Sequence, residues 1–216
     1  LIKSMPATAI MFLAGSVAIC GLPPFNGFIS EFLVYFAMIK GLSIHHFSSV
    51  IVFLFAIAEL AFVGTMAVLC FTKAYSIIFL GMKRSEAAEK AQSDVDKSML
   101  IPMGILASLT LIIGVMPQFI FGAVLKPVSL LTPIENVLAP TAVMWNISIF
   151  AFLFVVVLTV LILLKLKFTQ GRIELHETWG CGYNRGNNRM QYSASSYVSP
   201  FLSMLKPLFK KVFDVE

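Results

Sequence analysis

The stretch Gly21-Leu22-Pro23-Pro24-Phe25-Asn26-Gly27-Phe28-Ile29-Ser30-Glu31-Phe32 decides the fold, because it interrupts an apolar run that extends from Met5 to Lys40. Unbroken, this run would form a helix of about 50 Å at ~1.5 Å per residue, far longer than the ~30 Å hydrocarbon core of a bilayer. Two adjacent prolines cannot donate backbone hydrogen bonds, and the nearby glycines give the freed backbone room to turn. The pattern predicts two half-helices, roughly 6–22 and 28–40. The helix-break residues are Pro23, Pro24 and Gly27.

A carboxylate, Glu31, follows the break and has apolar neighbours on both sides. A broken transmembrane helix that carries an ionisable residue is the usual architecture of an ion-binding site in transporters. In the first turn of the second half-helix, the helix N-terminus favours the carboxylate and burial disfavours it, so the group could gain and lose a proton. The alternative is a proline-kinked helix with an acid at a protein interface. We predict that Glu31 serves proton translocation, and that Ser30 or Asn26 caps the half-helix.

The composition indicates an integral membrane protein. Of the 216 residues, 58% are hydrophobic and 12% are charged, and the mean hydropathy is +0.89. The apolar runs are continuous rather than alternating, which favours an all-α polytopic protein over a barrel. The net charge of +5 does not indicate nucleic-acid binding, because the basic residues cluster in a few loops and the tail. The three cysteines form no CxxC pair, so neither a metal site nor a disulfide is expected, and no cofactor is expected either.

The apolar runs predict about four transmembrane segments, including the broken one, and a polar tail with an amphipathic surface helix between Tyr197 and Val215. The expected order is a broken helix at 1–41, a long helix at 42–81, a cytoplasmic loop at 82–98, a helix at 99–117, an external interfacial segment at 118–142, a helix at 143–167 and a cytoplasmic tail at 168–216. With four crossings, thirteen of the sixteen Lys and Arg residues fall on one side and two on the other. The positive-inside rule therefore places both termini in the cytoplasm. The expected location is the cell's inner (plasma) membrane.

Two further ionisable residues, Glu59 and Lys73, lie inside the long second helix. They share a face, but ~21 Å of axial separation forbids direct contact. An unpaired Glu59 near mid-membrane would be costly, so it is expected to meet water or a residue of another helix or subunit. Lys73 either snorkels toward cytoplasmic headgroups or belongs to a chain of buried charges. His45 and His46 lie beyond Glu31, where they are either an exit relay or simply interfacial.

Several motifs carry a resemblance to a known family. They are Met5-Pro6-Ala7-Thr8-Ala9, Ala14-Gly15, the helix-break stretch, Phe71-Thr72-Lys73-Ala74-Tyr75, Phe79-Leu80-Gly81, Thr178-Trp179-Gly180-Cys181-Gly182-Tyr183 and Arg189-Met190-Gln191-Tyr192-Ser193-Ala194-Ser195-Ser196. The chain resembles the antiporter-like, proton-translocating membrane subunits related to complex I. More narrowly, it is similar to the large antiporter-like subunit of formate hydrogenlyase and of hydrogenase-4 type membrane-bound hydrogenases.

The resemblance implies a fold of many transmembrane helices with two inverted repeats, each holding a broken helix. On this interpretation, Glu31 is the charged residue of the second repeat, and the sequence is a C-terminal portion. The expected partners are other membrane subunits, peripheral hydrogenase or dehydrogenase subunits and the lipid bilayer. Redox energy in those partners would drive protonation changes along buried charges. The chain itself shows no catalytic constellation and no flavin, iron–sulfur or nickel ligands. The alternatives are a stand-alone sodium/proton antiporter module and a structural membrane anchor.

Overall fold

The computed structural model describes residues 1–43, 46–83, 85–91, 93–128, 130, 138–169, 191 and 193–205. Within these ranges the regular structure is entirely helical, which confirms the predicted all-α class. In chain order the elements are α1 (Pro6–Ile19), α2 (Asn26–Gly41), α3 (Phe47–Tyr75), the π-helical turn η1 (Ser76–Leu80), α4 (Glu86–Lys90), α5 (Lys97–Val115), α6 (Pro117–Val128), α7 (Leu138–Thr169) and α8 (Ala194–Leu205).

Three of the described helical stretches are long and apolar enough to cross a membrane. They are Phe47–Leu80 with 34 residues, Lys97–Val115 with 19 and Val143–Phe168 with 26. The helices α1 and α2 have 14 and 16 residues, or ~21 and ~24 Å, so each is short of the ~30 Å that a span requires. These lengths confirm a polytopic membrane protein.

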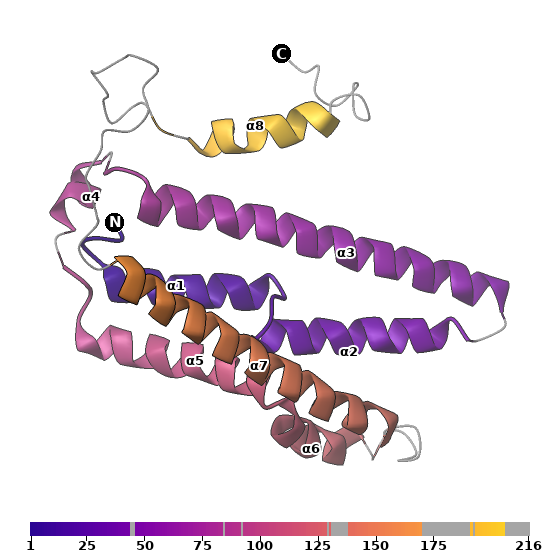
Figure 1. Ribbon diagram of the computed structural model, residues 1–216. Coiled ribbons are helices and arrows are strands. Elements are labelled where there is room, and N and C mark those ends of the chain that lie inside the picture. Colours follow the sequence, from indigo (N-terminus) through magenta and orange to yellow (C-terminus); the bar gives the residue numbers. More distant parts are fainter. Residues whose placement is uncertain are drawn as a thin grey trace.

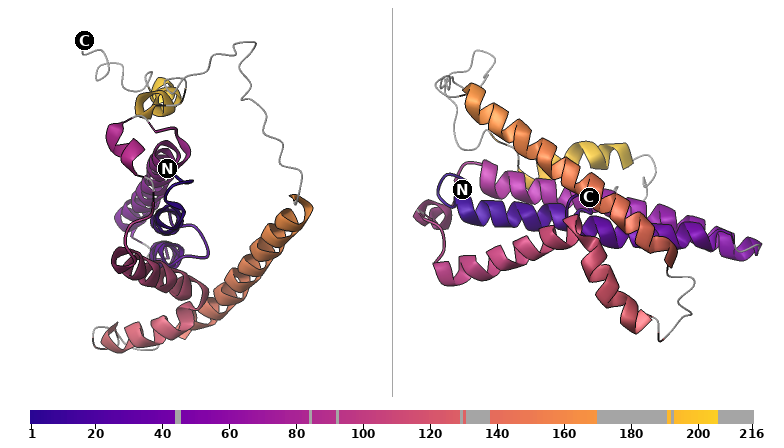
Figure 2. Two further views of the ribbon diagram at one scale, coloured as in Figure 1. Left: turned by 90° about the vertical axis from the view of Figure 1, so that its left-hand side faces the viewer. Right: turned by 60° about the horizontal axis from the view of Figure 1, so that its bottom comes forward.

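The two short helices lie end to end between α3 and α5, as Figure 1 shows. Both α1 and α2 contact α3 on one side and α5 on the other. The long helix α7 contacts α5 and α6 and diverges from the other helices toward its carboxyl end (Figure 2). Placed end to end, α1 and α2 therefore take the position of one long helix in the middle of the structure.

The start of α1 is held by a residue from a distant loop. Pro6 occupies the first helical position, where its missing N–H leaves no donor unsatisfied. The carboxylate of Asp94 accepts hydrogen bonds from the backbone N–H of Ala7 (3.0 Å), from the backbone N–H of Thr8 (3.0 Å) and from the Thr8 hydroxyl (2.8 Å). Asp94 thus acts as an N-terminal cap supplied from another part of the chain.

The segment expected at the outer interface contains a helix. Pro117 is buried at the start of α6, and the buried Ser148 hydroxyl of α7 contacts the Gln118 side-chain oxygen of α6. The same hydroxyl donates to the Met144 carbonyl one turn earlier in α7 (2.9 Å). A hydroxyl that bridges two helices fixes their relative position, so α6 and α7 form a joined pair.

The described part of the tail lies against α3. The helix α8 runs along α3 on the side away from α1 and α2 (Figures 1 and 2). Gln191 precedes it and accepts a hydrogen bond from the Met82 N–H (2.7 Å) just beyond η1. Residues 206–216, which include the rest of the expected amphipathic stretch, lie outside the described ranges. The position of this stretch at the membrane surface stays a prediction.

Candidate functional site

The first half-helix ends in a hydrogen-bonded turn that only glycine adopts readily. Gly21 has a φ of +63°, the left-handed conformation in which a Cβ atom is strained. Its N–H donates to the Ala18 carbonyl (3.3 Å), and the N–H of Leu22 donates to the Val17 carbonyl (3.3 Å). These two bonds form a Schellman motif. The prolines that follow cannot continue the helix, which explains why α1 ends at Ile19.

Two glycines allow the backbone on both sides of the break to pack closely. A Cβ atom on Gly27 would lie 1.8 Å from the Ala18 carbonyl oxygen of α1. A Cβ atom on Gly114 of α5 would lie 1.8 Å from the Pro24 carbonyl oxygen. Pro24 and Gly114 are both buried. The break is therefore a closely packed feature that α5 supports from one side.

Glu31 lies in the second turn of α2, because the helix begins at Asn26 rather than near residue 28. The expectation that it sits in the first turn is wrong by one turn, and the influence of the helix dipole falls off over that distance. The capping prediction is also wrong. Phe25 is the N-cap and makes no side-chain capping bond, while the Ser30 hydroxyl donates to the Gly27 carbonyl (2.9 Å).

The carboxylate of Glu31 lies directly against Gly21. A Cβ atom on Gly21 would be 2.4 Å from Oε2, 2.6 Å from Cδ and 2.7 Å from Oε1 of Glu31. The side chain reaches back toward the start of α2, the direction in which helical side chains point. Glu31 is half-buried, and it forms no hydrogen bond or ion pair with another residue in the described part of the chain. The Glu31 carboxylate is therefore not held by an ion pair with any described residue.

Glu59 lies at a depth similar to that of Glu31. Glu31 is ten residues before the end of α2 at Gly41, and Glu59 is twelve residues after the start of α3 at Phe47. Since these consecutive helices run in opposite directions (Figure 1), the two carboxylates lie about 15 and 18 Å from the connection. Glu59 is exposed on α3. No hydrogen bond or ion pair joins it to another described residue.

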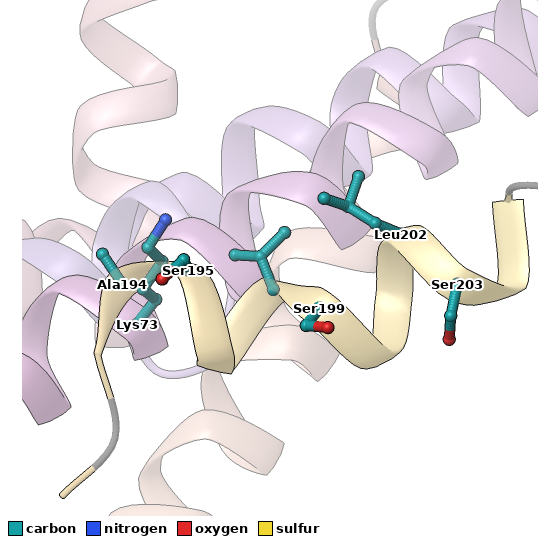
Figure 3. Close-up of a pocket in the computed structure, with 7 residues that line it drawn as sticks. Lys73, Ala194, Ser195, Ser199, Leu202 and Ser203 are labelled. Carbon is teal, nitrogen blue, oxygen red and sulfur yellow. The ribbon is translucent and has the colours of Figure 1, made fainter. Parts of the chain in front are cut away.

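Lys73 lies farther along α3 and faces α8. It borders a groove of about 670 Å³ together with Ala194, Ser195, Val198, Ser199, Leu202 and Ser203 of α8, as Figure 3 shows. The lysine is half-buried, and its Nζ atom has no partner among the described residues. The structure thus places Lys73 at a helix–helix groove, away from the break.

Of the two neighbouring histidines, the structure describes His46. His46 is exposed and is the N-cap of α3, without a side-chain capping bond. His45 lies outside the described residues. The exit-relay role of both stays a prediction.

Comparison with known proteins bears on the predicted resemblance. Hydrogenase-4 component B of Escherichia coli (strain K12) is 28% identical over 222 residues, covering 97% of this chain and 33% of that protein. Formate hydrogenlyase subunit 3 of the same organism is 36% identical over 89 residues, covering 41% of this chain and 15% of that protein. Na⁺/H⁺ antiporter subunit A1 of Staphylococcus saprophyticus is 32% identical over 133 residues, covering 59% of this chain and 16% of that protein.

The chain is a homologue of these subunits. The resemblance predicted from the sequence motifs is therefore confirmed. This homologue spans about one third of hydrogenase-4 component B and a smaller share of the other two proteins. No family model matches it.

Sequence reasoning missed several residues that position the broken helix in this homologue. The local pattern around Asp94 and Gly114 gives no sign that they contact residues 7, 8 and 24, since these pairings join distant parts of the chain. Gly21 was recognised as a turn residue, but its contact with Glu31 was not predicted. A signal does exist for Gly21: a glycine after a helix and before two prolines is typical of a C′ position.

Proposed function

We propose that this chain is the C-terminal part of a proton-translocating, antiporter-like subunit of a membrane-bound hydrogenase or complex I-like respiratory complex. Redox chemistry in partner subunits would drive proton transport through it. The observation that carries the proposal is Glu31: a half-buried carboxylate beside a packed helix break, without a pairing partner in the described chain. An ionisable residue at a transmembrane helix break is the arrangement that transporters use for ion sites.

Each predicted site residue has a role in this proposal. Pro23 and Pro24 interrupt the helix, and Gly27 lets its two halves pack closely. Glu31 takes up and releases the proton. Glu59 and Lys73 are further members of the proton path, or charges that serve packing against other helices. His45 and His46 would pass protons to the outer surface. The chain supplies acid–base groups only, and bond chemistry belongs to the partners.

The names of the relatives and the exposure of Glu59 both support binding to partner subunits. The relatives are named as components or subunits of hydrogenase-4, formate hydrogenlyase and a Na⁺/H⁺ antiporter. Glu59 is exposed within a helix long enough to span the bilayer, and a carboxylate facing lipid is costly. We therefore expect another membrane helix to cover this part of α3. Peripheral hydrogenase or dehydrogenase subunits would bind on the cytoplasmic side, where both termini would also lie.

A second candidate function is a sodium/proton antiporter without redox input. The 32% identity to Na⁺/H⁺ antiporter subunit A1 over 59% of this chain favours it. Vesicles that contain the assembled complex separate the two candidates. The proposal predicts that proton flux starts when the electron donor is added and stops when it is exhausted. Proton flux driven by a sodium gradient alone, and unaffected by the donor, would establish the antiporter instead.

A structural membrane anchor is the third alternative, and assembly distinguishes it. An anchor needs its charges for helix association, so neutralising Glu31 would reduce the amount of assembled complex. The proposal predicts that assembly persists and that proton transport is lost.

A further inference from the structure

We infer that Gly21 is a positioning residue for Glu31, because its missing Cβ atom provides the backbone surface on which the carboxylate lies. This inference rests on the proposed function, since Glu31 carries the proton there. The contact itself is observed independently of any function. Among the glycines described, Gly21 is the one at which an added Cβ atom would meet carboxylate atoms of an acidic side chain.

The contact is specific in direction as well as distance. With a φ of +63°, the backbone of Gly21 turns the position of a Cβ atom toward α2. All three carboxyl-group atoms of Glu31 lie 2.4–2.7 Å from that position. Real Cβ contacts are longer than 3.0 Å. Any side chain at position 21 therefore requires the carboxylate to move.

The backbone at Gly21 is held in place by hydrogen bonds and close packing. The Schellman hydrogen bonds hold Gly21 and Leu22 to the last turn of α1. The close approaches of Gly27 to Ala18 and of Gly114 to Pro24 hold the two sides of the break together. With the backbone fixed, the flexible Glu31 side chain is the part that shifts. Proton transfer depends steeply on the separation of donor and acceptor, so a shift of about 1 Å can lower the rate by ~100-fold.

The experiment compares Gly21→Ala with Gly15→Ala in the assembled complex reconstituted in vesicles. Gly15 lies within α1, and a Cβ atom there meets nothing within 4 Å, which makes it the control. Proton uptake per electron is measured, normalised to assembled complex. Gly21→Ala is expected to lower it by about tenfold or more, whereas Gly15→Ala leaves it unchanged. Equal coupling in both variants would overturn the inference.

One further variant, Gly21→Asn, separates the contact from backbone strain. Asn tolerates the left-handed conformation far better than Ala but still carries a Cβ atom. If the contact matters, Gly21→Asn is as damaging as Gly21→Ala. If strain alone matters, Gly21→Asn is close to wild type, which contradicts the inference.

Shortening the acid provides the rescue. Glu31→Asp retracts the carboxylate by one methylene, so Gly21→Ala with Glu31→Asp is expected to couple better than Gly21→Ala alone. Glu31→Asp on its own is expected to couple less well than wild type. If the two losses simply multiply, Gly21 does not act through Glu31.

A chemical readout keeps this test distinct from that of the proposed function. Dicyclohexylcarbodiimide modifies protonated carboxyl groups in apolar surroundings, and modification of Glu31 is followed by peptide mass spectrometry. Gly21→Ala should change the modification rate several-fold relative to Gly15→Ala. If proton uptake per electron proved independent of Glu31, the proposed function would fail. The modification rate of Glu31 would still test its contact with Gly21. An unchanged rate would remove the contact itself.

Discussion

Asp94 links the loop between α4 and α5 to the start of α1. Partial desolvation acts to raise the pKa of Asp94, but the hydrogen bonds from the backbone and hydroxyl of Thr8 and from the backbone of Ala7 outweigh it and lower the pKa below its usual 3.8. The folded state thus binds its proton less readily than the unfolded chain does. Asp94 therefore stabilises the fold above pH 3.8, and this contribution is lost as the pH falls through the lowered pKa.

Asp94→Asn is expected to lower the thermal unfolding temperature at pH 7, because a neutral amide is a weaker acceptor for the α1 N-terminus. Below the lowered pKa the wild-type residue is itself neutral, so the difference between the two proteins should shrink. Unfolding in detergent at a series of pH values measures this. Asp96→Asn is the matched control, since Asp96 is the N-cap of α5 and makes no side-chain capping bond. A difference that grows toward acid pH would contradict the account.

Among the elements, α5 supports the break through one close approach. Its Gly114 leaves room for the Pro24 carbonyl, and a Cβ atom there would also be 2.5 Å from the Phe25 carbonyl carbon. Backbone atoms cannot rotate away as a side chain can. The packing between α5 and the broken helix therefore depends on the absence of one methyl group.

Gly114→Ala is expected to destabilise the protein by roughly 1–3 kcal/mol, the usual range for overpacking. This cost opposes the gain of up to ~1 kcal/mol that Ala normally provides in a helix. Gly122→Ala in α6, where a Cβ atom meets nothing within 4 Å, is expected to be neutral or stabilising. Chemical denaturation in detergent measures both. Equal stability of the two variants would mean that α5 does not support the break.

At the scale of the whole molecule, the long apolar helices are covered very little by their own chain. In an 18-residue apolar stretch of each candidate span, the buried share of residues is 0% in Phe47–Leu80, 6% in Lys97–Val115 and 11% in Val143–Phe168. A groove of about 430 Å³ also borders the break, between Pro23, Phe28 and residues of α7. Exposed apolar surfaces of this extent are expected to face lipid or other membrane helices.

Thiol labelling in intact cells tests the proposed orientation. If the positive-inside rule holds, Cys181 in the polar tail faces the cytoplasm and resists a membrane-impermeant maleimide. A cysteine introduced by Ser43→Cys, at an exposed position between α2 and α3, should be labelled from outside. Cys20 lies next to α1 and Cys70 lies within α3. Because position 43 and Cys70 share the tryptic peptide 41–73, fragment-ion sequencing of the modified peptide identifies the labelled residue. The reverse pattern would invert the topology and move Glu31 to the inner half.

The sequence predicted the broken helix and the membrane class because prolines and apolar run lengths act locally. The position of Glu31 beyond the break was predictable for the same reason. The sequence pattern did not predict the start of α2 at Asn26, because the N-cap residue Phe25 makes no side-chain capping bond. The cap from Asp94 and the fit of Gly114 depend on residues about 87 and 90 positions away in sequence, and no local pattern encodes such pairings.

The central claim is that Glu31 carries a proton, and Glu31→Gln tests it most directly. Gln keeps the size and hydrogen-bonding capacity of the side chain but removes its titratable proton. If Glu31 were half of a buried ion pair, the substitution would destabilise the complex by roughly 3–5 kcal/mol and reduce its assembly. The measurement is proton uptake per electron in vesicles, normalised to assembled complex, with electron transfer to a soluble acceptor as the control. We predict normal assembly and electron transfer with proton uptake sharply reduced, and partial uptake in Glu31→Asp. Normal proton uptake per electron in Glu31→Gln would contradict the account.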